Sequence, residues 1–161
     1  MVSKTIKISV AVSVLAVVAI IGTAAFFSFF KTSIKELQKT DKAVVAVSFP
    51  ARNVSVNAKV ADTAVSRAQG LSGTEPLKED EGMFFVFDNP GRQIFFMKDM
   101  KYSLDIFWLD ESKKIIFIER EVSPDTYPKT FSSDKPAKYV LEVIAGFAER
   151  HGVSLGDMAS W

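Results

Sequence analysis

One segment in the second half of the chain reads Leu104-Asp105-Ile106-Phe107-Trp108-Leu109. Branched and aromatic side chains favour a β-strand, in which successive side chains point to opposite faces of the sheet. Leu104, Ile106 and Trp108 therefore share one face, whereas Asp105 shares the other face with Phe107 and Leu109. Both faces of this strand are apolar, so Asp105 is expected to lie among core side chains.

Two neighbouring segments repeat this pattern of one charge on an apolar face. Tyr139–Ile144 is a predicted strand in which Glu142 lies on the same face as Val140 and Ile144. A second predicted strand, Gln93–Lys98, places Lys98 after Phe96 and Ile94 on one face. Each of these charges thus interrupts an otherwise apolar face of a predicted strand.

The remaining pattern is that of a mixed fold with short helices. Residues 110–113 are turn-forming and predict a hairpin between 104–109 and 115–121. Asp88-Asn89-Pro90-Gly91 predicts a tight turn that leads into the strand 93–98. The other predicted elements are strands at 43–49, 54–60 and 83–87, a helix capped by Asp62 or Thr63 and ended by Gly70, a long loop at 123–136, and a helix at 147–151.

The N-terminal residues Ile8–Phe30 contain no charged residue, Asn, Gln or Pro. As a helix this run would measure roughly 35 Å, enough to cross a hydrocarbon core of about 30 Å. We therefore expect one N-terminal transmembrane helix with a polar stem, together residues 1–42, followed by a single globular domain, residues 43–161. Cleavage of the run as a signal peptide, with secretion of the domain, is the alternative, since Lys4 and Lys7 precede it. Lysines lie on both flanks, so their count does not decide the orientation in the membrane.

Composition excludes several classes of function. The chain has 20 basic and 19 acidic residues, so no basic surface for nucleic acid is indicated. It has no cysteine and one histidine, His151, which excludes disulfides, thiolate chemistry and multi-histidine metal sites. His151 is expected at the end of a helix in a structural role, and the acidic run Glu79-Asp80-Glu81 matches no calcium loop. No metal or cofactor is predicted.

The charges predicted inside the core suggest a site. A buried carboxylate is costly unless it is paired, so the simplest arrangement brings Arg67 or Lys98 to Asp105 or Glu142. One interpretation is that the strands are two-sided, that these charges reach solvent at strand ends, and that any pairing only satisfies the fold. The other is a small polar pocket that holds a ligand. Its residues would be Arg67, Lys98, Asp105 and Glu142, with walls from Met97, Tyr102 and Trp108.

Several segments, taken in order, resemble the DUF192 family, also called UPF0127. They are Arg67-Ala68-Gln69-Gly70-Leu71, residues 81–87, Phe96-Met97-Lys98-Asp99-Met100, Leu104-Asp105-Ile106, residues 139–142, Gly146 and Gly156-Asp157. The resemblance runs from about Val54 to the C-terminus. It implies a compact α+β domain with a strongly curved, barrel-like, mostly antiparallel sheet, and a domain outside the cytoplasm. It implies no reaction. Two positions depart from the family pattern, Ser72 where Met is usual and Phe96 where Trp is usual, so a pocket wall is expected to differ in size.

Three functions are compatible with these features. The first is a membrane-anchored, non-catalytic module that binds a small polar ligand or a protein of the cell envelope. The second is an envelope hydrolase that uses Asp105 and Glu142 as acid and base. The third is an assembly subunit, which would expose a large apolar patch. An acid and base pair for glycoside chemistry would have to lie within about 5 to 10 Å of each other in an open cleft.

Overall fold

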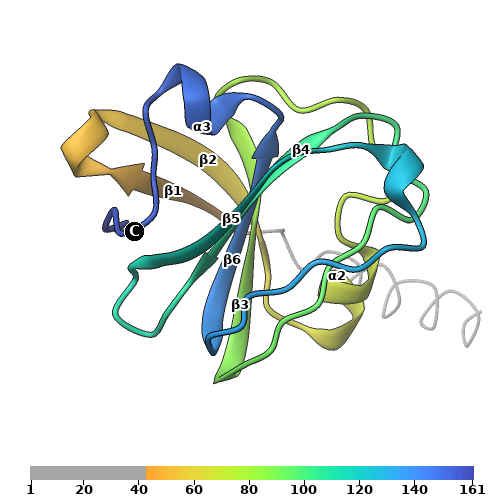
Figure 1. Ribbon diagram of the computed structural model, residues 1–161, viewed down its shortest axis with the longest axis horizontal. Coiled ribbons are helices and arrows are strands. Elements are labelled where there is room, and N and C mark those ends of the chain that lie inside the picture. The colour runs from red at the N-terminus through yellow and green to blue at the C-terminus, as the bar shows by residue number, and fades with distance from the viewer. Residues whose placement is uncertain (1–42) are drawn as a thin grey trace, which may run out of the picture. The chain divides into compact units, whose positions relative to one another are not determined.

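Six strands form one mixed sheet in residues 43–161, the part of the chain that this computed structural model describes (Figure 1). The strands are β1 (Val44–Phe49), β2 (Val54–Ala61), β3 (Glu81–Gly91), β4 (Leu104–Leu109), β5 (Ile115–Val122) and β6 (Ala137–Ile144). The helices are α2 (Ala64–Gln69), α3 (Phe147–Arg150) and the short 3-10 turns η1 (Pro50–Arg52) and η2 (Pro124–Thr126). The predicted α+β class is confirmed for this part of the chain.

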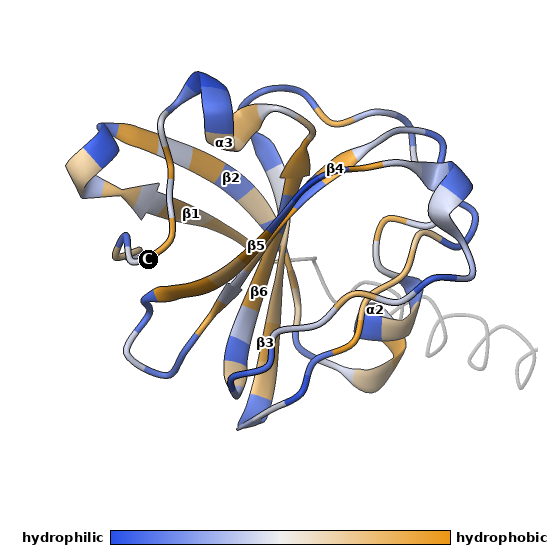
Figure 2. Ribbon diagram, in the orientation of Figure 1, coloured by the Kyte–Doolittle hydropathy of each residue, from blue (hydrophilic) through white to orange (hydrophobic). Residues whose placement is uncertain are grey.

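The strand order is β1-β2-β3-β6-β4-β5. Strands β2 and β3 pair in parallel and are joined through α2, whereas the other neighbouring strands pair antiparallel. The predicted hairpin of β4 and β5 is present. Its connecting loop is hydrophilic, in contrast to the largely apolar central strands (Figure 2).

The sheet is not closed into a barrel, so the barrel-like description from the resemblance is wrong in that respect. The edge strands β1 and β5 do not pair with each other. Instead, the C-terminal residues make isolated bridges to both edges, from Ser160 to Ser48 in β1 and from Met158 to Lys114 just before β5.

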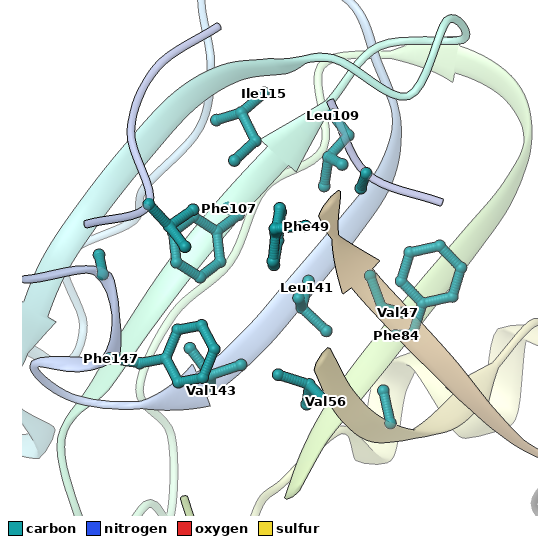
Figure 3. Packing of buried hydrophobic residues seen from close by; sticks show 14 residues of the cluster. Val47, Phe49, Val56, Phe84, Phe107, Leu109, Ile115, Leu141, Val143 and Phe147 are labelled. Atoms are coloured by element: carbon teal, nitrogen blue, oxygen red, sulfur yellow. The ribbon is translucent and has the colours of Figure 1, made fainter. Parts of the chain in front are cut away.

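A layer of core covers each face of the sheet. On one face, which we call the α3 side, Phe147 of α3 packs with residues of β1, β2, β4 and β6 (Figure 3). The other face, the α2 side, carries Leu104, Ile106 and Trp108 together with Phe85, Met97 and Val140. The alternation in Leu104–Leu109 therefore assigned its side chains to the two faces correctly.

Close packing of backbone sets the position of β6. A methyl group on Gly82 of β3 would lie 2.8 Å from the Glu142 carbonyl oxygen and 2.8 Å from a methyl carbon of Val56. Only glycine therefore lets β3 approach both neighbours this closely. Met83 then pairs with Glu142, whose side chain lies on the α2 side with Val140 and Ile144.

Two local predictions were wrong. The residues 88–91 lie within β3, which continues to Gly91 and pairs with Ala137 after a bulge. The predicted strand 93–98 is absent, because β6 takes the position beside β3. Within that segment Phe95 makes only an isolated bridge to Phe131.

The predicted transmembrane helix Ile8–Phe30 and the stem lie outside the described residues. Within residues 43–161, no helix has the length and hydrophobicity needed to cross a membrane.

Candidate ligand-binding site

A pocket of about 370 Å³ lies on the α2 side, and Glu142 is part of its lining. We call it the Glu142 pocket. Its residues come from α2 and the turn after it, from β3, from the segment 94–100, and from β4 and β6. They are Arg67, Ala68, Gln69, Gly70, Leu71, Ser72, Phe85, Phe87, Ile94, Phe95, Phe96, Met97, Met100, Leu104 and Glu142.

The side of the pocket formed by α2 depends on how that helix begins and ends. Thr63 caps the helix: its Oγ1 accepts a hydrogen bond from the backbone N–H of Ser66 at 3.0 Å, and the Oγ of Ser66 accepts one from the backbone N–H of Thr63 at 3.0 Å. Gly70 ends the helix at a positive φ of 49°, which an L side chain rarely adopts. The backbone turns there, and the next residue, Leu71, is buried in the lining of the pocket.

Glu142 is the chemically unusual residue of this pocket. Its side chain is only 6% exposed, and no hydrogen bond or ion pair joins it to another described residue. Burial raises the pKa of its carboxyl to about 8. The carboxyl oxygens are not sealed from solvent, so they are open to the cavity that Glu142 lines. Buried polar groups in proteins nearly always have a partner, and a ligand group in the cavity could supply one.

Arg67, the other charged residue of the pocket, does not pair with Glu142. Its Nη1 donates hydrogen bonds to the carbonyl oxygens of Asp62, at 2.6 Å, and Val86, at 2.9 Å. The guanidinium also lies over the ring of Phe87, 5.1 Å from its centroid. These contacts fix Arg67 at the α2 edge of the pocket.

Asp105 lies on the opposite face of the sheet. Its side chain is fully buried, and its two oxygens accept hydrogen bonds from the backbone N–H groups of Glu121 and Ala148, each at 2.8 Å. It lines a separate pocket of about 410 Å³ next to α3. Both oxygens are occupied by the backbone, so Asp105 joins β4, the end of β5 and the start of α3.

The predicted ion pairs are therefore wrong. Among the described residues, neither Asp105 nor Glu142 pairs with Arg67 or Lys98. Lys98 is exposed, and its carbonyl oxygen accepts a hydrogen bond from Ser72 Oγ at 2.9 Å. The carboxylates also lie on opposite faces of the sheet in separate pockets, which excludes an acid and base pair of Asp105 and Glu142.

Of the seven predicted site residues, Arg67, Met97 and Glu142 line one pocket together. Trp108 is fully buried, with its indole N–H donated to the Gln93 carbonyl oxygen at 2.9 Å. Tyr102 is buried next to Thr74, 2.8 Å between their hydroxyl oxygens. Burial is the main cause that raises the pKa of Tyr102, against a lowering by this hydrogen bond. Tyr102 and Trp108 thus belong to the core beside the pocket.

The weaker candidates have structural partners. Glu79 receives hydrogen bonds from Arg150 at 2.7 and 2.9 Å and lies 2.9 Å from Nε2 of His151. Glu81 pairs with Lys78. No group of His, Asp and Glu within residues 43–161 is arranged to hold a metal ion.

Sequence reasoning missed most of the apolar lining of the pocket. Phe85 and Phe87 come from the segment 81–87, Leu71 from 67–71 and Met100 from 96–100, all segments that carry the resemblance to DUF192. Those separate segments meet around one cavity. Their common membership in the family motifs was the signal that could have located it.

Comparison with known proteins identifies the family. Residues 46–161 match DUF192, a family described as an uncharacterized ACR. The chain belongs to the DUF192 family. No curated protein matches it.

Two solved structures share the fold of this DUF192 protein. A protein of unknown function from Novosphingobium aromaticivorans DSM 12444 is 25% identical, with a TM-score of 0.71, over 76% of this chain and 89% of that chain. A candidate transcription regulator from Sinorhizobium meliloti 1021 is 27% identical, with a TM-score of 0.70, over 76% of this chain and 96% of that one. The matched fold makes up almost all of the second chain.

Proposed function

We propose that this DUF192 protein is a non-catalytic binding module that holds a small ligand in the Glu142 pocket. The observation that carries the proposal is the Glu142 carboxyl, which is buried, lines a cavity and has no partner among the described residues. A ligand with one polar group and an apolar body would satisfy this carboxyl and cover the aromatic walls. The volume of about 370 Å³ is within the range of small-molecule sites.

A thermal-shift screen of residues 43–161 tests the proposal. A compound that binds the native state raises the melting temperature by mass action. The screen should contain amines, amino acids, sugars, nucleotides and organic acids, and any compound that binds should lose its effect in Glu142→Gln. Glu119→Gln is the matched control, because it makes the same chemical change in β5, outside the pocket lining. Stabilisation that persists in Glu142→Gln would place the ligand elsewhere, and no stabilisation by any compound would argue against the binding function.

We also propose that residues Ile8–Phe30 anchor the protein as a single span in the cell membrane, with residues 43–161 outside the cytoplasm. The apolar length of that run supports the anchor. The full chain should then remain with the membrane pellet after alkaline washing, and protease added outside intact cells should digest the domain. A mature protein in the medium that begins after the apolar run would instead indicate signal cleavage.

A protein partner is the second candidate for the same site. Ile94 and Phe96 line the pocket and are half exposed, and Tyr127 lies beside Phe96 with 6.1 Å between ring centroids. These three side chains expose apolar surface, two of them in the lining of the pocket and the third against Phe96. An envelope protein that inserts one side chain into the pocket would bury this surface, and its binding should be weakened by Phe96→Ala.

A further inference from the structure

The charges around the Glu142 pocket restrict the chemistry of its ligand. Arg67 and Glu142 are the charged residues in the lining, and Arg67 already donates to two carbonyl oxygens. Glu142 is more than nine-tenths buried and has no basic partner among residues 43–161. The pocket therefore contains one carboxyl with which no described side chain makes a hydrogen bond or ion pair.

The walls of the pocket are suited to a positive charge. Phe85, Phe95 and Phe96 line it, together with Phe87, whose ring is already covered by Arg67. The face of an aromatic ring attracts a cation, and such rings recurrently surround ammonium groups in ligand sites. Rings also accept the apolar body of a ligand, so the same walls serve both parts of one molecule.

The charged residues of the lining disfavour an anionic ligand. Its charge would repel the ionised form of the Glu142 carboxyl within an apolar cavity, and Nη1 of Arg67, the basic residue of the lining, is already bonded to two carbonyl oxygens. A neutral ligand could accept a hydrogen bond from the protonated carboxyl but would leave the ionised form without compensation. An ammonium group supplies the missing counter-charge and donates hydrogen bonds to the carboxylate.

We propose that the ligand of the Glu142 pocket is an organic cation, a protonated amine or methylated ammonium carried by an apolar body. This inference rests on the proposed binding function and narrows it. The ammonium contacts Glu142, and the apolar body lies among the phenylalanines towards Ile94 and Phe96 at the mouth.

Three probes with a phenyl group and different head groups test the inference. They are 2-phenylethylammonium, 2-phenylethanol and 3-phenylpropionate, titrated by calorimetry into the full chain and into residues 43–161. The cation should bind at least tenfold more tightly than the alcohol, and the anion should bind most weakly. Glu142→Gln should remove the preference for the cation, while Glu119→Gln should leave it unchanged.

A second readout uses benzyltrimethylammonium, whose charge does not depend on pH. A cation that binds the ionised carboxylate displaces its proton. Affinity should therefore rise roughly thirtyfold between pH 6.5 and 9, given a pKa of about 8 for Glu142. Tyr102, the neighbouring titratable group, does not produce this change, because burial raises its pKa further above its usual range.

The outcomes separate this inference from the binding function. If the alcohol or the anion binds more tightly than the cation and this binding is lost in Glu142→Gln, the proposal of a cationic ligand is wrong, but the pocket remains a ligand site. Binding of the cation without proton release, or with equal affinity in Glu142→Gln, would also overturn it. If none of these probes binds, the proposal of a cationic ligand is wrong, and the broader thermal-shift screen decides whether the pocket binds any ligand.

Discussion

Glu142 makes the stability of the domain depend on pH. Its carboxyl has a pKa of about 8 in the folded protein against 4.5 for the unperturbed group. The protonated form is thus favoured by folding, and this stabilisation is complete below about pH 4.5 and is lost as the pH rises towards 8. The free energy of unfolding should fall by about 1.4 kcal/mol per pH unit within this window.

The variant Glu142→Gln isolates this effect. Its side chain has no charge to desolvate, so urea denaturation at pH 5, 6, 7 and 8 should give a much flatter dependence than in the wild type. Between pH 5 and pH 8, the stability of the wild type relative to Glu142→Gln should fall by roughly 3 to 4 kcal/mol. Equal slopes in the wild type and Glu142→Gln would mean that the carboxyl is solvated or paired.

At the level of the single residue, the sequence located the unusual charges but not their partners. Alternation showed that Asp105 and Glu142 lie among apolar side chains, and both are buried. The prediction that basic side chains pair with them failed, because backbone N–H groups hold Asp105 and nothing described holds Glu142. A backbone donor leaves no signal in the local sequence, since every residue except proline has one.

The contact of β4 with α3 depends on Asp105. In Asp105→Asn, one of the two backbone N–H groups that now bond the carboxylate, those of Glu121 and Ala148, would face an amide N–H₂ group instead of an oxygen. An unsatisfied buried donor costs about 1 to 3 kcal/mol. Urea denaturation should show a loss of about that size, whereas the exposed Asp134→Asn should change stability by less than about 0.5 kcal/mol.

Ligand binding by Asp105→Asn serves as a control that separates a loss of stability from a loss of the binding site. Asp105 lies outside the lining of the Glu142 pocket, so Asp105→Asn should bind ligand as the wild type does wherever it remains folded. A stable Asp105→Asn protein that no longer bound ligand would contradict the assignment of the two carboxylates to separate pockets.

At the level of the elements, local patterns succeeded where both partners were near in sequence. The β4–β5 hairpin and the capped helix α2 follow from adjacent residues. The prediction for residues 88–98 was wrong because the turn-forming residues 88–91 favour a hairpin when only the local sequence is considered. The structure continues β3 to Gly91 and pairs it with β6, whose partner residue Ala137 is remote in sequence. Whether residues 88–91 form a local turn or extend β3 beside the distant strand β6 is decided only when the whole sheet is assembled.

At the level of the whole molecule, the segments that carry the resemblance to DUF192 form one pocket. Arg67–Leu71, Phe85, Phe87, Phe96–Met97 and Met100 surround it, and Glu142 lies on the strand at the centre of the sheet. The two departures from the family pattern, Ser72 and Phe96, also line it. The expected difference in the size of a pocket wall therefore applies to the Glu142 pocket, whose shape depends on both of these side chains.

The methionines of residues 43–161 allow the central claim to be tested directly. Met97 and Met100 line the Glu142 pocket, whereas Met158 lies on the C-terminal segment and is half exposed. With ¹³C-methyl methionine, a titration by NMR with compounds from the thermal-shift screen should move the Met97 and Met100 signals to saturation and leave Met158 unchanged. The same compounds should not move them in Glu142→Gln. Stabilising compounds that shift only Met158, or that shift Met97 and Met100 equally in Glu142→Gln, would contradict a ligand site built on Glu142.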